Sequence, residues 1–187
     1  MSVLICLASD TPFEKLENPH CKQMSVNEAL EQGIEVPQSM LMDPELDRDD
    51  PEAFLWTDVR IEISIVEGKA QIAPDPEDNF DIWPIGCADG LKTEKKYLAA
   101  VEWGQCTPAR AGMLSDYIRR HMERAEETEL WNIWEGEPEL VRVHERRVSL
   151  SALVPEDILT LCEEDSAHEK IIGGIEECQQ FCLVIKK

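Results

Sequence analysis

The chain has 187 residues, and 39 acidic against 18 basic residues give it a formal net charge of −21. A chain of this length can bury enough surface to fold without a metal ion or a disulfide, and its 43% of hydrophobic residues is enough for a core. The charge repels phosphates and anionic lipids, so we expect neither direct nucleic-acid binding nor binding to a membrane surface.

The N-terminal sequence MSVLICLASD has no basic segment, and its apolar run is too short for a signal peptide. No stretch of the chain approaches the ~18 apolar residues of a membrane-spanning helix. The seven cysteines are an odd number, which favours free thiols in a reducing compartment. We therefore expect a cytoplasmic protein.

The first half of the chain contains three recognisable elements. Residues 2–8 form a continuous apolar run, which predicts a strand buried on both faces. Ser25 begins a capping-box pattern for a short helix near 26–32, which Gly33 would end. Apolar and polar residues alternate over 59–65, which predicts a half-exposed strand.

The second half contains two main helices and several apolar segments. Thr107 is a natural N-cap, and Pro108 suits the first position of a helix over about 108–126. A second helix that begins with a proline is predicted over about 155–164. Further segments along the chain, most of which predict strands, lie at 80–86, 95–104, 129–136, 140–150 and 180–186.

Strands and helices follow one another in mixed order, which favours the α+β class. We expect a single domain over residues 1–187, built on one mixed β-sheet of about five to seven strands with the apolar end segments near its centre. The two main helices would pack on one face of the sheet. Long acidic loops would lie at about 41–55 and 73–81.

The acidic loops lie in the most strongly charged part of the chain, because residues 41–90 contain 14 acidic and three basic residues. An EF-hand calcium loop needs alternating oxygen ligands and a glycine at its sixth position, but Pro51 and Glu52 break this pattern in a loop that starts at Asp47. We therefore predict no metal site. The loops are either only solvated or bind a basic partner. The candidate partner-binding residues are Asp43, Glu45, Asp47, Asp49, Asp50, Glu52, Asp75, Glu77 and Asp78.

Cys106 is the strongest candidate for chemistry. It lies just before a predicted helix start, where unpaired backbone N–H groups would stabilise a thiolate, and Arg110 could hold an anion. Thiol phosphatases place five residues between these two groups, whereas three intervene here. Helical periodicity places Met113 and His121 on one buried apolar stripe and Arg110 off it. His121 is a candidate base, although its place on this stripe favours a packed side chain. An ordinary thiol at a loop–helix junction is the alternative interpretation.

Other patterns do not predict a site. Cys178, Cys182 and His168 supply one cysteine pair, whereas structural zinc sites need four ligands, usually in two pairs. The chain has no Gly-rich phosphate loop, so we predict no cofactor. The basic segment 142–147, RVHERR, could pair with the protein's own acids.

These patterns favour a non-catalytic, acidic protein-interaction domain. An inhibitor or immunity-type protein that neutralises a basic partner is one concrete form of it. The first alternative is a small cysteine-dependent hydrolase or transferase that uses Cys106. The second is a nucleic-acid mimic. The sequence does not predict the oligomeric state.

Overall fold

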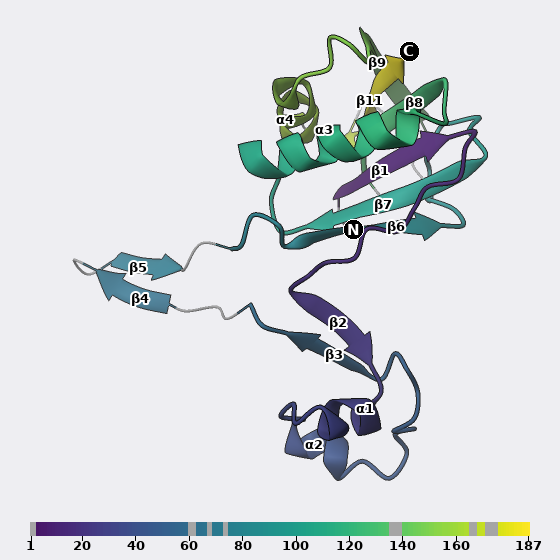
Figure 1. The fold of residues 1–187 in the computed structure, drawn as a ribbon. Helices are drawn as coiled ribbons and strands as arrows, with labels where there is room; N and C mark the ends of the chain where they lie inside the picture. Colours follow the sequence, from purple (N-terminus) through teal and green to yellow (C-terminus); the bar gives the residue numbers. More distant parts are fainter. Residues whose placement is uncertain are drawn as a thin grey trace. The chain divides into compact units, whose positions relative to one another are not determined.

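The computed structural model describes residues 3–59, 63–66, 69–72, 75–134, 140–164, 168–170 and 176–187. The chain divides into two compact units (Figure 1). We call Met1–Glu17 together with Phe80–Lys187 the sheet unit. Asn18–Asn79 is the inserted unit, because it interrupts the sheet unit between the first two strands of the latter. The division into two compact units does not test whether residues 1–187 form a single domain, so the single domain stays a prediction.

The sheet unit contains a seven-stranded sheet and two helices. Its helices are α3 (Pro108–Met122) and α4 (Pro155–Glu163). Its strands are β1 (Val3–Ser9), β6 (Phe80–Ile85), β7 (Tyr97–Trp103), β8 (Glu127–Trp134), β9 (Leu140–Ser149), β10 (His168–Lys170) and β11 (Glu176–Lys186). The neighbours run in the order β6-β7-β1-β8-β11-β9, and β10 pairs with the beginning of β11. Only the pairing of β9 with β11 is parallel among the described strands, so the sheet is mixed and the α+β prediction is confirmed.

The two apolar ends of the chain both lie inside the sheet, as predicted. β1 pairs with β7 and β8, and β11 pairs with β8 and β9. Successive side chains of a strand point to opposite faces. Leu7 therefore packs in the core beneath the helices, whereas its neighbour Cys6 belongs to a second cluster on the other face. A strand covered on both faces must be apolar at every position, which explains the unbroken apolar run.

The two helices cover one face of the sheet, as predicted (Figure 1). α3 begins where the Thr107 side chain accepts a hydrogen bond from the N–H of Arg110 at 3.2 Å. α4 begins at Pro155, and its first turn is closed by the Asp157 carboxylate, which accepts the N–H of Val154 at 3.1 Å. Their apolar side chains meet those of the sheet in the main core, which includes Leu114, Ile118, Ile158, Leu130 and Leu183.

The opposite face is covered by the connection between β6 and β7, residues 86–96. Ala88 and Leu91 of this connection pack against the second apolar cluster. Gln180 on β11 donates a hydrogen bond from its Nε2 to the carbonyl of Gly90 at 2.7 Å, and Gly90 takes a φ of 81°. We call this the helix-free face of the sheet.

The inserted unit has a small core of its own. Its elements are β2 (Cys21–Met24), α1 (Val26–Glu31), α2 (Gln38–Leu41), β3 (Phe54–Thr57), β4 (Ile63–Val66) and β5 (Lys69–Ile72). Two antiparallel pairs form, β2 with β3 and β4 with β5. The buried core residues are Met24, Val26, Ala29, Val36 and Phe54.

The short helix of the inserted unit is confirmed. The Ser25 hydroxyl accepts a hydrogen bond from the N–H of Glu28 at 3.0 Å, and Gly33 follows the helix with a φ of 72°. The strand predicted over 59–65 is realised in part by β4, and residues 60–62 lie outside the described residues.

None of the described helices combines the length and the apolar character that crossing a membrane requires.

Candidate functional site

All nine predicted partner-binding acids lie in the inserted unit and are exposed. Six of them occupy the loop between α2 and β3, and we call these six the acidic surface. The acidic surface consists of Asp43, Glu45, Asp47, Asp49, Asp50 and Glu52. The other three, Asp75, Glu77 and Asp78, lie where the chain leaves the inserted unit.

The acidic surface is folded by its own side chains. Asp43 accepts a hydrogen bond from the N–H of Glu45 at 2.9 Å. In the same way, the carboxylate of Asp47 accepts a hydrogen bond from the N–H of Asp49 at 3.0 Å, and that of Asp50 accepts one from the N–H of Glu52 at 2.9 Å. These are Asx turns, in which a short acidic side chain replaces the backbone acceptor of a turn. The carboxylates therefore shape this loop through hydrogen bonds to its own backbone.

The charge of the acidic surface is not compensated within the described part of the chain. None of its six carboxylates forms an ion pair with a described residue. The one base of the loop, Arg48, instead donates a hydrogen bond from its guanidinium to the carbonyl of Leu41. Asp49 accepts a hydrogen bond from the neutral amide of Asn27 at 2.8 Å. The loop thus presents bare negative charge to solvent.

The acids at the other end of the inserted unit surround a histidine. His20 contacts Asp58 through Nδ1 and Asp78 through Nε2, both at 2.8 Å. The carboxylates of Asp78 and Asp58, which accept hydrogen bonds from the imidazole, raise the pKa of His20 above its usual value. His20 precedes β2 and Asp58 follows β3, so this histidine joins three segments of the unit. Sequence reasoning missed this contact, because these acids lie 38 and 58 residues away along the chain.

No group of three or more His, Cys, Asp or Glu side chains converges as a metal site needs, as far as the described residues show.

The three predicted catalytic candidates do not form one site. Cys106 lies before the first turn of α3 and His121 near its last, about 20 Å apart at 1.5 Å per residue. Arg110 is only 1% exposed, and its Nη1 donates to the carbonyl of Gln105 at 2.9 Å. The expectation that Arg110 lies off the buried side of the helix is therefore wrong. Its guanidinium helps to hold the loop before the helix.

The His121 side chain is packed, as its place on the apolar stripe of the helix predicts. It is 3% exposed and stacks on Phe13, with ring centroids 4.3 Å apart. Burial lowers the pKa of His121 below its usual value, and the nearby Arg124 adds to this effect. A neutral, enclosed imidazole at this place contributes to the core.

The structure places a second thiol beside Cys106. Cys162, on the last turn of α4, makes a hydrogen bond with Cys106 that holds the pKa of Cys106 below its usual value, although burial opposes this. The same hydrogen bond, together with burial, raises the pKa of Cys162. The two cysteines are far apart in sequence, so no local spacing motif could reveal the pair.

The basic segment on β9 is occupied by the protein's own groups. Arg146 donates to the carbonyl of Asp157 at 2.8 Å, and Arg147 pairs with Glu145 at 2.5 Å. His144 contacts Gln179 at 2.6 Å and stacks on Phe181. These contacts agree with the interpretation that the segment pairs with groups of its own chain.

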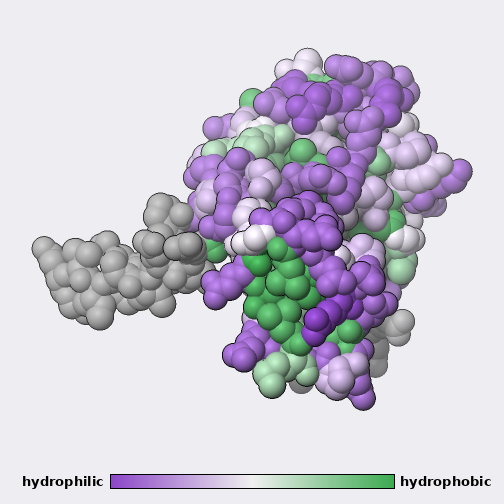
Figure 2. All heavy atoms as spheres, turned by 60° about the horizontal axis from the view of Figure 1, so that its bottom comes forward, coloured by the Kyte–Doolittle hydropathy of each residue, from purple (hydrophilic) through white to green (hydrophobic). Residues whose placement is uncertain are grey.

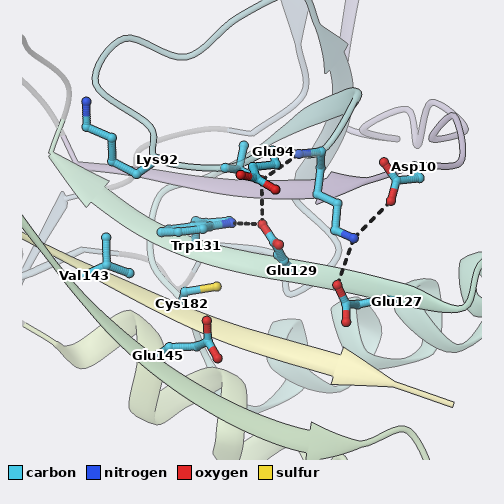
Figure 3. A pocket seen from close by; sticks show the side chains of 11 residues that line it. Asp10, Lys92, Glu94, Glu127, Glu129, Trp131, Val143, Glu145 and Cys182 are labelled. Carbon is cyan, nitrogen blue, oxygen red and sulfur yellow. Dashed lines mark hydrogen bonds and ion pairs between the residues drawn. The ribbon is translucent and has the colours of Figure 1, made fainter.

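The helix-free face carries a pocket of about 480 Å³ (Figure 3). The Glu127 carboxylate meets Lys95 at 2.8 Å and Lys186 at 2.5 Å. These contacts, that of Lys186 first, lower the pKa of Glu127, and the contact with Glu127 raises the pKa of Lys95 to about 12. Glu129 accepts hydrogen bonds from Thr93 at 2.6 Å and Trp131 at 2.8 Å.

The charges that line this pocket are therefore largely balanced by their neighbours. Its one thiol, Cys182, is 2% exposed, and burial raises its pKa, so it is protonated at neutral pH. Lys92 extends away from the cluster of ion pairs in Figure 3. The polar contacts that line the pocket join the 86–96 connection to the sheet. None of the described residues that line the pocket is an activated nucleophile.

No family model, curated protein or solved structure matches this chain. The function must therefore be inferred from the geometry and charge of its own residues.

Proposed function

We propose that this chain is a non-catalytic, cytoplasmic protein that binds a basic protein partner through the acidic surface of its inserted unit. Asp75, Glu77 and Asp78, at the other end of the inserted unit, would add to the negative charge of that unit. An inhibitor or immunity-type protein that neutralises a basic enzyme is the form of this function that we favour. The thiol-enzyme and nucleic-acid-mimic alternatives stay predictions.

One observation carries the proposal: six exposed carboxylates share a single loop, and none has an ion-pair partner among the described residues. Clustered charges of one sign create a field that raises the rate of encounter with an oppositely charged protein. The field acts over a Debye length of about 8 Å at physiological salt. The partner would therefore be recognised first by its positive charge.

Exposed apolar side chains lie along the same part of the chain and would supply affinity. Met42 is 73% exposed and Leu55 is 63% exposed, at the two ends of the acidic surface. Figure 2, in which the bottom of Figure 1 comes forward, shows a hydrophobic area bordered by hydrophilic residues. A flexible methionine adapts to varied partner surfaces. We expect a partner that presents an apolar side chain flanked by lysine or arginine.

The test removes charge without disturbing the turns. In the triple variant Asp43→Asn, Asp47→Asn, Asp50→Asn, each amide keeps the side-chain oxygen that accepts the turn hydrogen bond. Partners captured by the wild-type protein at low salt would be identified by mass spectrometry and their association rates measured. We expect the variant to associate several-fold more slowly at low salt, with the difference vanishing at about 0.5 M salt.

The matched control neutralises three exposed acids of the sheet unit, Asp89→Asn, Asp116→Asn and Glu156→Gln. It changes the net charge by the same amount but leaves the acidic surface intact, so its association rate should stay close to that of the wild type. Equal association rates for the wild type and the acidic-surface variant would rule out the proposal. Equal losses in both triple variants would show that net charge acts without a specific surface.

A further inference from the structure

Cys106 and Cys162 meet at the contact between the two helices of the sheet unit. Cys106 directly precedes Thr107, the N-cap of α3, and Cys162 lies in the last turn of α4. Both side chains are partly buried and pack against the same apolar core. Their thiols are joined by a hydrogen bond, with Cys106 as the acceptor.

The backbone on both sides of this thiol pair is held in place. Arg110 donates to the carbonyl of Gln105, the residue before Cys106. On the other side, the Asn132 amide donates to the carbonyls of Leu161 and Glu164, at 2.8 and 3.0 Å, which flank the position of Cys162. Because the buried side-chain amide of this asparagine donates hydrogen bonds to two carbonyls at the end of α4, it fixes that helix end relative to the sheet. Hydrogen bonds therefore hold the backbone near each of the two cysteines in place.

Three other cysteines of the sheet unit, Cys6, Cys182 and Cys87, are arranged differently. Cys6 and Cys182 both lie opposite Trp131, on the two strands that flank β8. Two strand spacings separate them, about 9.6 Å between backbones, which is too far for a disulfide. Cys87 is exposed on the 86–96 connection. These thiols serve as internal references for the reactivity of the pair.

We propose that Cys106 and Cys162 form a reversible intramolecular disulfide when the protein meets a hydroperoxide. The Cys106 thiolate attacks one peroxide oxygen, the O–O bond breaks, and Cys106 becomes a sulfenic acid while hydroxide or alkoxide leaves. The Cys162 sulfur then attacks the Cys106 sulfur, the S–O bond breaks, and the hydroxyl group leaves as water with the Cys162 proton. With hydrogen peroxide, two thiols are oxidised to one disulfide and the peroxide is reduced to two waters.

The division of roles follows from the site. Cys106 is beside the N-terminus of α3 and near Arg110, so its thiolate is the better nucleophile. Cys162 is the proton donor of the pair and becomes the resolving thiol. The product would link the start of α3 to the end of α4 inside the sheet unit. It involves no residue of the acidic surface, so this inference stands apart from the proposed partner binding.

The experiment uses the full-length, fully reduced protein and hydrogen peroxide as the probe. After quenching with catalase, free thiols are alkylated with N-ethylmaleimide under denaturing conditions and peptides are mapped by mass spectrometry. We expect five of the seven thiols to be alkylated, and the cross-linked peptides that contain Cys106 and Cys162 to be two hydrogen atoms lighter than the sum of the two unmodified thiol peptides. Reduction with dithiothreitol should restore both thiols.

Variants test the order of the steps. In Cys162→Ser the Cys106 sulfenic acid cannot be resolved, so dimedone should trap several-fold more of it than in the wild type. Cys87→Ser, which removes an exposed thiol, should leave the Cys106–Cys162 bond unchanged. A disulfide between other cysteines, or peroxide treatment that leaves all seven thiols alkylated, would overturn the proposal. The wild-type map decides this even if a variant fails to fold.

Discussion

The sheet unit and the acidic surface of the inserted unit differ in the contacts that their acidic residues make. In the sheet unit, Glu127 meets two lysines and Glu145 meets Arg147. In the inserted unit, four acids of the acidic surface accept hydrogen bonds from backbone N–H groups or a neutral amide, and the local arginine donates to a backbone carbonyl. Residues 18–79 hold 15 acidic and four basic residues, a balance of −11 out of −21 for the chain. The excess charge is thus concentrated in a third of the molecule and left available.

The two units also differ in how they are held together. The sheet unit has an apolar cluster on each face of its sheet. The inserted unit has one small cluster of five buried residues and relies more on turns, a capped helix and the His20 contact. A small core leaves a larger share of the stability to polar contacts. The following experiments compare the two units on this point.

The largest effect is expected from truncating the main core. Leu130 is fully buried beneath the helices, so Leu130→Ala should lower the free energy of unfolding by about 3–5 kcal/mol. Met24→Ala in the inserted unit should cost about 2 kcal/mol, because a small core near the surface relaxes more easily. Urea unfolding followed by tryptophan fluorescence measures both. A larger loss for Met24→Ala would contradict the difference in core size.

Helix caps come next. Ser25→Ala removes the hydroxyl that closes α1 and should destabilise the inserted unit by about 1 kcal/mol. Thr107→Ala at α3 is the counterpart in the sheet unit and should cost a similar amount. Hydrogen exchange separates the two, since only amides of the unit that carries the variant should exchange faster. Faster exchange throughout both units would show that they unfold together.

The two histidines should give the units opposite dependence on pH. The pKa of His20 is raised in the fold, so its contribution to stability is complete below the unfolded pKa of about 6.5 and is lost as pH rises through the higher folded value. The pKa of His121 is lowered by burial, so its contribution is present above about pH 6.5 and is lost as pH falls towards the lower folded value. NMR titration of the two imidazoles measures these shifts. His20→Asn and His121→Phe should each remove one slope from the pH profile of unfolding, and a shift of both imidazoles in one direction would refute the contrast.

The smallest effect concerns single charges. Glu127→Gln breaks two ion pairs in the sheet unit and should cost up to about 1 kcal/mol at neutral pH. Asp47→Asn keeps the turn hydrogen bond and relieves repulsion between neighbouring acids, so we expect a change within about 0.5 kcal/mol. Thermal unfolding at low and high salt compares them. If Asp47→Asn were the costlier change, the acidic surface would have to be a structural network.

Much of the fold could be predicted because its signals are local. The apolar run of β1, the alternation of faces along β8 and the Thr107–Pro108 start of α3 each depend on residues that are neighbours in sequence. Met113 and Arg110 show the limit. Helical periodicity placed Met113 on the buried stripe and Arg110 off it, yet Met113 is 37% exposed and Arg110 is enclosed. Which rim of a helix is covered depends on the neighbouring elements, not on the helix alone.

Sequence by itself determined the amount of charge, the exposure of the acidic loop and the elements that flank it, because composition and short-range patterns express these directly. Only the tertiary structure decided which charged and reactive groups meet. The pairing of His20 with Asp58 and Asp78, and of Cys106 with Cys162, joins residues separated by tens of positions. Such contacts depend on how strands and helices pack, and nothing in the local sequence encodes a partner so far along the chain.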